Sequence, residues 1–153
     1  WKGQSGFNVY TPLVLGDRRV VFVNRGFVPY DRKAAETRAN GQVTGTVTVT
    51  GLARDALQEK PSFIVPDNEP EKNVFYWKDL SAMAATAGLP TGMETVPFFI
   101  DAGDAPNPGG LPVGGVTLID LPNNHLQYAV TWYGLALALV GVAVFRFRRR
   151  RTV

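Results

Sequence analysis

The chain has 153 residues, of which 16 are lysine or arginine and 13 are aspartate or glutamate, so its formal net charge is +3. Five of the arginines lie within residues 146–151, and the rest of the chain, with 11 basic and 13 acidic residues, offers no basic field for nucleic acid. The lack of cysteine and the single histidine exclude a zinc or copper site built from several thiolate or imidazole ligands of this chain.

The first 30 residues predict a β-hairpin. Residues 6–15 are extended in pattern, and Gly16 and Asp17 supply a turn. Residues 19–29 then read as a strand of β-branched and aromatic side chains, too continuous to leave one face in water.

The next segments are less regular. Residues 31–40 are polar and suit a short helix or a loop, whereas residues 44–52 alternate valine with threonine and predict an antiparallel strand with one buried face. The alternative for this second segment is an edge of threonines in contact with water. Residues 61–73, rich in proline and acidic side chains, predict a long loop.

The middle of the chain predicts one short helix. Asp79 can cap a helix over residues 80–87, with Gly88 as its stop and Pro90 just beyond. The apolar side chains on this helix, those of Leu80 and Met83, suit the core of the domain better than a ligand site.

The last part of the domain predicts two further strands. They cover residues 96–101 and 116–120, with a glycine- and proline-rich loop over 102–115 between them and a hinge over 121–124. The fold class is therefore α+β: a small, mostly antiparallel β domain with one short helix. Asp101 and Asp104, beside the loop, are expected to form turns.

Nothing in this domain predicts catalysis. The Gly109-Gly110 and Gly114-Gly115 pairs lack the strand-to-helix context of a phosphate-binding loop. A serine nucleophile would have no histidine base except His125, so we expect a protein that is not an enzyme.

Residues 126–145 form a run of about 20 residues without formal charge, the length that crosses a hydrocarbon core of about 30 Å as a helix. The arginines that follow place the C-terminus on the cytoplasmic or matrix side. We therefore predict an exported domain over 1–122, a transmembrane helix with a polar entry turn over 123–146, and a basic tail over 147–153. A buried core helix is the alternative. Export of the domain also requires a signal upstream of Trp1, such as a first transmembrane helix.

The predicted helix has two distinct faces. With Asn124 as its cap, Tyr128 and Trp132 lie within about 60° of His125. On this face, one interpretation is an interfacial aromatic belt with a polar histidine, and the other is a site for a flat apolar cofactor such as haem with His125 as axial ligand. The opposite side carries small residues that permit close helix packing, namely Gly134, Ala138 and Gly141.

One arginine, Arg25, lies inside an apolar strand and must be paired there. A carboxylate, a cluster of backbone carbonyls or a haem propionate could each serve as its partner, and a structural partner is the favoured interpretation.

Several segments resemble the Surfeit locus protein 1 family, whose members are assembly factors for cytochrome c oxidase in mitochondria and many bacteria. The similarity covers residues 6–145 in order, and its most specific part is NNHLQYAVTWYG; the segments are 23–29, 66–73, 76–79, 99–102, 112–115 and 123–134. One departure is Phe27, where many relatives carry tryptophan.

This resemblance implies a second transmembrane helix upstream and a domain that faces the periplasm or the intermembrane space. It also implies a role in delivering or retaining haem a for the largest oxidase subunit, with His125 as the proposed iron ligand and Tyr128 and Trp132 beside it. The implied partners are the membrane and that subunit, with haem a synthase as a further candidate. A second hypothesis is a membrane scaffold or accessory subunit that binds no haem and holds an oxidase intermediate through its small-residue face.

Overall fold

A computed structural model describes residues 1–117 and 123–150. The chain divides into two compact units, residues 1–117 and 118–153, and each is described by itself. The predicted limits of the exported domain, the membrane span and the basic tail stay predictions.

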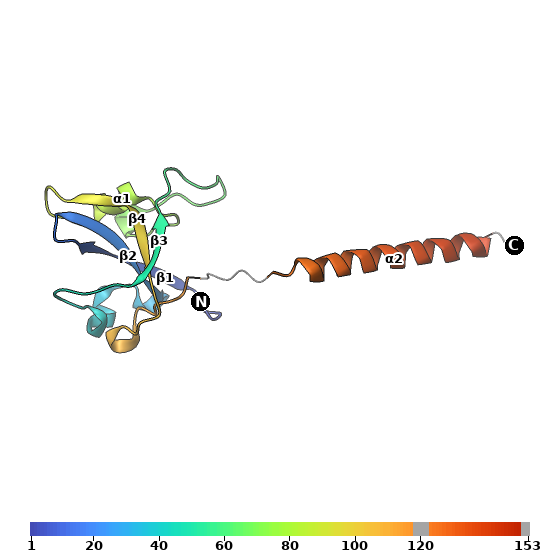
Figure 1. Cartoon of the computed structure of the whole chain (residues 1–153), viewed down its shortest axis with the longest axis horizontal. Helices are drawn as coiled ribbons and strands as arrows, with labels where there is room; N and C mark the ends of the chain where they lie inside the picture. The colour runs from blue at the N-terminus through green and yellow to red at the C-terminus, as the bar shows by residue number, and fades with distance from the viewer. Residues whose placement is uncertain (118–122, 151–153) are drawn as a thin grey trace. The chain divides into compact units, whose positions relative to one another are not determined.

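The first unit is built on one four-stranded sheet (Figure 1). Its order is β1-β2-β4-β3, with β2 and β4 parallel and the two outer pairs antiparallel. The strands are β1 (Gly6–Val14), β2 (Arg19–Pro29), β3 (Gly51–Asp55) and β4 (Glu94–Ala102). Together with one short α-helix, this confirms the predicted α+β class and its mostly antiparallel sheet.

The predicted hairpin is present, and its second strand is the centre of the core. On one face of β2, Val21 and Val23 pack with Val96 of β4. On the other face, Phe22 packs with Phe99 and with Met83 of the helix α1 (Leu80–Thr86). Burial on both faces explains why β2 shows no alternation of polar and apolar residues.

The helix α1 begins and ends as predicted, within one residue. The Asp79 carboxylate accepts a hydrogen bond of 3.0 Å from the Ala82 N–H, which makes Asp79 the N-cap. Gly88 follows the helix with a φ of +62°, a conformation that favours glycine. Met83 is buried, as expected for a core residue.

The strand predicted over 96–101 is β4, and it holds a proline although it pairs on both edges. Its register with β2 shifts between the pairs Val20–Thr95 and Phe22–Phe99, at the position of Pro97. Because proline has no N–H to donate, it is tolerated in a central strand at such an irregularity.

The strand predicted over 44–52 is wrong in its limits. Only Gly51 and Leu52 belong to β3, whose five residues are all exposed. The partner strand β4 ends at Ala102, which lies opposite Gly51, so β4 offers no partner to the residues before Gly51. One hydrogen bond, from the Gly103 N–H to the Thr50 carbonyl, continues the pairing past this point. The threonines at 44–50 lie in water, which was the alternative interpretation.

The other connections hold short 3-10 helices. The segment predicted as a short helix or loop, 31–40, contains most of η1 (Tyr30–Arg32) and η2 (Ala35–Gly41), and the long loops contain η3 (Pro70–Lys72) and η4 (Pro108–Gly110). Of the strand predicted over 116–120, residues 116 and 117 are not in a strand and the rest lie outside the described residues. Residues 121 and 122 of the predicted hinge also lie outside them.

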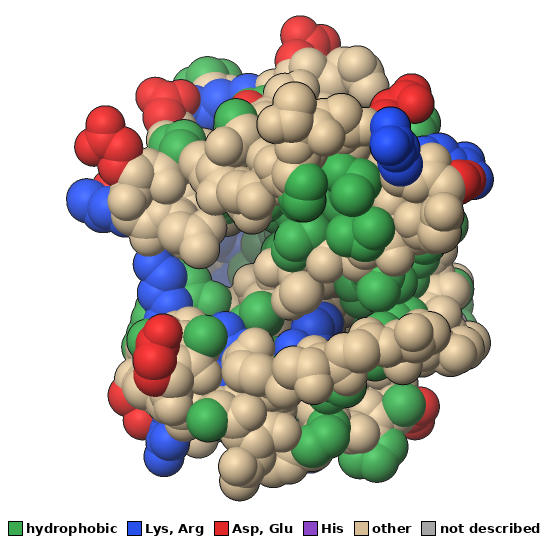
Figure 2. All heavy atoms as spheres, turned by 90° about the vertical axis from the view of Figure 1, so that its left-hand side faces the viewer, with side chains coloured by type: hydrophobic (Ala, Val, Ile, Leu, Met, Phe, Trp, Pro, Cys, Tyr) green, Lys and Arg blue, Asp and Glu red, His purple; other side chains and the backbone are tan. Residues whose placement is uncertain are grey.

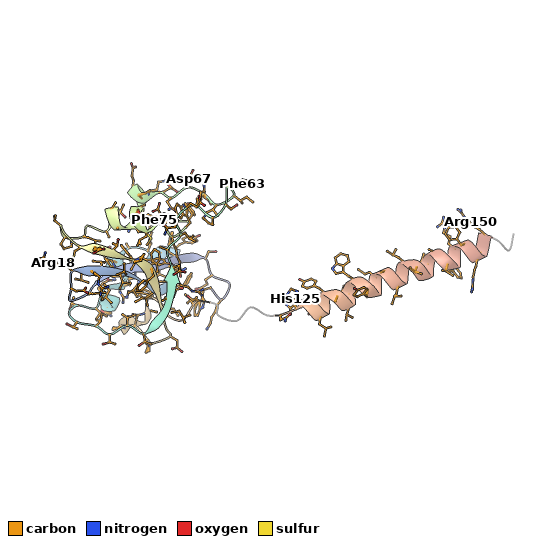
Figure 3. The ribbon with its side chains drawn as sticks, turned by 45° about the horizontal axis from the view of Figure 1, so that its top comes forward. Arg18, Phe63, Asp67, Phe75, His125 and Arg150 are labelled. Atoms are coloured by element: carbon orange, nitrogen blue, oxygen red, sulfur yellow. The ribbon has the colours of Figure 1, made fainter. Side chains whose placement is uncertain are left out.

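The second unit contains one continuous helix, α2 (His125–Arg150), with His125 and Arg150 at its two ends (Figure 3). It is long and apolar enough to cross a bilayer, and none of its residues is buried. The exposure of its described side chains gives no support to the core helix that was the alternative interpretation.

We predict that Gly26→Ala destabilises the domain by about 3 kcal/mol or more, through backbone strain and a main-chain clash. Gly26 has a φ of +111°, and a Cβ there would overlap the Val113 carbonyl. Urea unfolding followed by circular dichroism measures the effect. Gly45→Ala is the matched control: its φ is +86° with open space around it, so it should lose only about 1 kcal/mol. Equal losses would show that the contact with Val113 is unimportant.

Candidate functional site

The predicted site residues lie at the start of α2. The Asn124 carbonyl accepts the first helical hydrogen bond, from the Tyr128 N–H at 3.0 Å, so Asn124 occupies the cap position as predicted. The side chain that bonds the helix start is that of Asn123, whose Oδ1 accepts from the His125 N–H at 3.2 Å. Both asparagines therefore help to define where the helix begins.

His125, Tyr128 and Trp132 share one face of α2, since the helix is continuous through all three. Each is exposed, with about two thirds of the tyrosine and tryptophan surface accessible. The structure thus brings together an imidazole and two aromatic side chains on one exposed face of the helix. Haem ligation by His125 stays a prediction.

The opposite face of α2 carries small side chains. A Cβ added at Gly134 or Gly141 would meet nothing within 4 Å, and Ala138 is exposed. Another helix could approach the backbone of α2 closely along this face.

A second group of functional-type side chains lies in the sheet domain. The register of the central strands places Asn24 of β2 beside Asp101 of β4, and the Asn24 amide donates a hydrogen bond of 3.0 Å to the Asp101 carboxylate. Both are buried, with exposures of 5% and 4%. The other end of the amide, the Asn24 Oδ1, accepts from the Gly26 N–H at 3.1 Å.

Two cations balance the buried carboxylate. Arg54 of β3 and Lys78, just before α1, lie 3.4 Å and 3.6 Å from the oxygens of Asp101. The Lys78 ammonium also lies over the rings of Tyr10 and Phe99, at 5.8 Å and 5.6 Å from their centres. Burial, with a smaller effect of the Asp101 charge, raises the pKa of Tyr10, so this phenol stays neutral.

We call Asn24, Arg54, Lys78 and Asp101 the polar cluster. Together with Tyr10 they line an open pocket of about 500 Å³. Among the described residues, no buried side-chain polar atom lacks a hydrogen-bond partner. The cluster is therefore an ion-pair and hydrogen-bond network that joins β2, β3, β4 and the segment before α1.

Sequence patterns alone did not reveal this cluster. Asp101 lies in β4, as the strand predicted over 96–101 has it, but the expectation that it forms a turn is wrong, because its carboxylate is buried in the core and bonded to Asn24. A signal was present, since Asn24, Lys78 and Asp101 each belong to a different segment that carries the family resemblance. Only the pairing of β2 with β4 shows that those segments meet.

Arg25 is paired within the domain, as favoured. Its guanidinium donates to the Gly41 carbonyl at 2.6 Å and to the Asn107 Oδ1 at 3.0 Å. Partial burial, and to a lesser extent the charge of Arg38, lowers the pKa of Arg25. The arginine thus ties β2 to the two loops that hold η2 and η4.

One face of the molecule shows no large patch of a single charge. Figure 2 shows acidic, basic and hydrophobic side chains interspersed over one face of the molecule, without a field of one sign. Among the described residues, no three histidine or acidic side chains are grouped so that they could hold a metal ion. Of the side chains described, His125 is the one imidazole that could bind iron.

Comparison with known proteins decides the family. The model of the SURF1 family matches residues 1–137. The chain belongs to the SURF1 family. This confirms the resemblance drawn from the sequence, and family membership together with α2 indicates a membrane protein.

The chain is similar in sequence to individual members of the family. The chain is 44% identical over 149 residues to Surfeit locus protein 1 of Rattus norvegicus, covering 96% of the chain and 46% of the relative. It is 46% identical over 136 residues to Surfeit locus protein 1 of Homo sapiens, covering 88% and 43%. The chain thus spans about half the length of the curated SURF1 relatives that it matches. No solved structure matches it.

We predict that Asp101→Ala lowers the free energy of unfolding by about 2 kcal/mol. It leaves the buried Asn24 amide without its acceptor and two cations without their partner, although the partial exposure of Arg54 and Lys78 limits the loss. Urea unfolding of the full chain in detergent measures it. Asp17→Ala, which removes an exposed pair with Arg19, is the control and should change stability little. Equal stability of the two variants would contradict a structural role for the polar cluster.

Proposed function

We propose that this chain acts in the assembly of cytochrome c oxidase, binding or retaining haem a for insertion into the largest oxidase subunit. One observation supports this most: in a member of the SURF1 family, the single histidine begins a helix of membrane-spanning length and shares an exposed face with Tyr128 and Trp132.

The proposal includes an orientation in the membrane. Arginines in the last turn of α2 favour the cytoplasmic or matrix side for that end, so His125 lies at the outer boundary. The sheet domain then faces the periplasm of a bacterial inner membrane or the intermembrane space of a mitochondrion. Haem a, which is apolar over most of its surface, would be held where the bilayer meets this compartment.

The side chains fit one wall of a haem site. A neutral imidazole is a common axial ligand of haem iron, and aromatic rings can lie along the macrocycle. In this function haem a is cargo, handed on rather than used. Among the described residues no cysteine or second histidine can complete the coordination, and α2 offers one face rather than a cavity. We infer that groups beyond this face, on another part of the protein or on a partner, complete the site, and an open site of this kind suits transfer of the cargo.

The small-residue face of α2 supports a second candidate function. Gly134, Ala138 and Gly141 allow a partner helix to pack closely, which suits a scaffold or accessory subunit that stabilises an oxidase intermediate without haem. The largest oxidase subunit is the proposed partner in both cases, and haem a synthase is a further one for the haem function. The two functions are compatible, because they use opposite faces of α2.

The haem function predicts that His125→Ala abolishes binding of haem a by the purified full chain, because the iron loses its ligand. Loss of the Soret band and of binding stoichiometry in titrations with haem a measures this. Gln127→Ala is the matched control: it lies in the same turn, about 200° around the helix, and should bind normally. Equal haem binding by the His125→Ala variant and the unmodified chain would leave the scaffold function as the surviving candidate.

The scaffold function predicts that Gly134→Leu reduces recovery of the oxidase subunit in pull-downs from membranes, because the added side chain separates the helices. Ala143→Leu adds similar bulk about 180° away on the helix and should not reduce recovery. Circular dichroism should show that the sheet domain stays folded in both variants. Full recovery with Gly134→Leu would show that the small-residue face does not contact the oxidase subunit.

A further inference from the structure

The loop over residues 59–68 presents two large apolar side chains to solvent. Phe63 and Ile64 are 93% and 77% exposed, and Phe63 is labelled near the end of this loop in Figure 3. They lie at the centre of a tight turn closed by a hydrogen bond of 3.2 Å from the Val65 N–H to the Ser62 carbonyl. Such central positions usually carry glycine, proline or short polar residues. We call residues 61–66 the apolar tip.

The base of this loop is well anchored. The Asn68 Oδ1 accepts hydrogen bonds from the Tyr76 N–H at 2.8 Å and the Trp77 N–H at 3.2 Å, which ties the loop to the segment before α1. An ion pair of 2.7 Å between Lys60 and Asp67 closes the two sides just below the tip. The apolar tip therefore extends from a base that is hydrogen-bonded to the rest of the domain.

The chemistry of the tip is that of an interfacial anchor. Its sequence, Pro-Ser-Phe-Ile-Val-Pro, contains no charged residue, and the adjacent lysine and aspartate neutralise one another. Insertion would thus bury apolar surface without dehydrating an unpaired charge. It would also need no anionic lipid.

The chain keeps a membrane within reach. Seven residues lie between Thr117, the last described residue of the sheet domain, and His125, the first residue of α2, and the eight steps from one Cα to the next can span at most about 29 Å. A domain tethered this closely meets the bilayer surface at a high effective concentration, so even a weak insertion would be populated. A protein partner would explain the same exposure, but the tether favours lipid.

We propose that the apolar tip inserts into the interface of the bilayer that α2 spans, with Phe63 and Ile64 among the headgroups and upper acyl chains. The inference rests on the membrane placement of α2 proposed above and is independent of haem binding. It gives the sheet domain a second attachment to the membrane besides α2.

The test uses the absence of native cysteine. Single cysteines replace Phe63, Ile64, Glu59, Thr91 or Leu135 in the full chain, which is spin-labelled and reconstituted in vesicles of phosphatidylcholine alone. Electron paramagnetic resonance then compares collisions of the label with oxygen, enriched in the bilayer, and with a water-soluble nickel complex. Labels at 63 and 64 should be shielded from nickel and accessible to oxygen. Labels at the exposed positions 59 and 91 should report water, and the label at 135 should report the hydrocarbon.

A second comparison tests the side chain itself. With the label at 64, Phe63→Ser should raise the ratio of nickel collisions to oxygen collisions at least severalfold. Val43→Ser, which removes another exposed apolar side chain, should leave this ratio unchanged. A label at 63 that reports water while the label at 135 reports hydrocarbon overturns the inference and leaves the membrane span intact. Water at both 63 and 135 overturns the membrane placement as well.

Discussion

The parallel pairing of β2 with β4 is the contact on which the sheet domain depends. It joins the N-terminal hairpin to the second half of the domain, and it brings Phe22 beside Phe99 and Asn24 beside Asp101. The first pair belongs to the part of the core that packs against α1, and the second pair belongs to the polar cluster. Because the two strands lie about 75 residues apart in the chain, a large loop must be closed before either pair can form.

Local chemistry made several elements predictable. The N-cap Asp79, the glycine after α1 and the apolar run of β2 each carry their signal within a few residues. The segment 44–50 shows the limit: its valine–threonine alternation suits a strand, but β4 ends too early to pair with it. Asp101 was misjudged for the same reason, since its role depends on Asn24, Arg54 and Lys78 from three other parts of the chain. The faces of α2 were easier, because helical geometry alone sets which residues share a side.

The two units differ in how their charged and apolar side chains find contacts. In the sheet domain, ionic side chains such as Lys78 and Asp101 find partners within the unit. In the second unit, none of the described side chains of α2, His125 included, is buried, and they have no core of their own to pack into. A bilayer would cover the apolar surface, and the proposed haem a and partner helix would cover the histidine and the small-residue face.

The edges of the sheet have a consequence for copies of the protein that lie side by side in a membrane. Proteins anchored in a membrane are crowded in two dimensions, where exposed strands invite edge-to-edge aggregation. One edge strand, β1, contains Pro12, which lacks an N–H, and the other, β3, has only five residues and ends in Arg54 and Asp55. Both features oppose the addition of a strand from a neighbouring copy. Neighbouring domains can therefore collide often on the same surface without polymerising through their sheets.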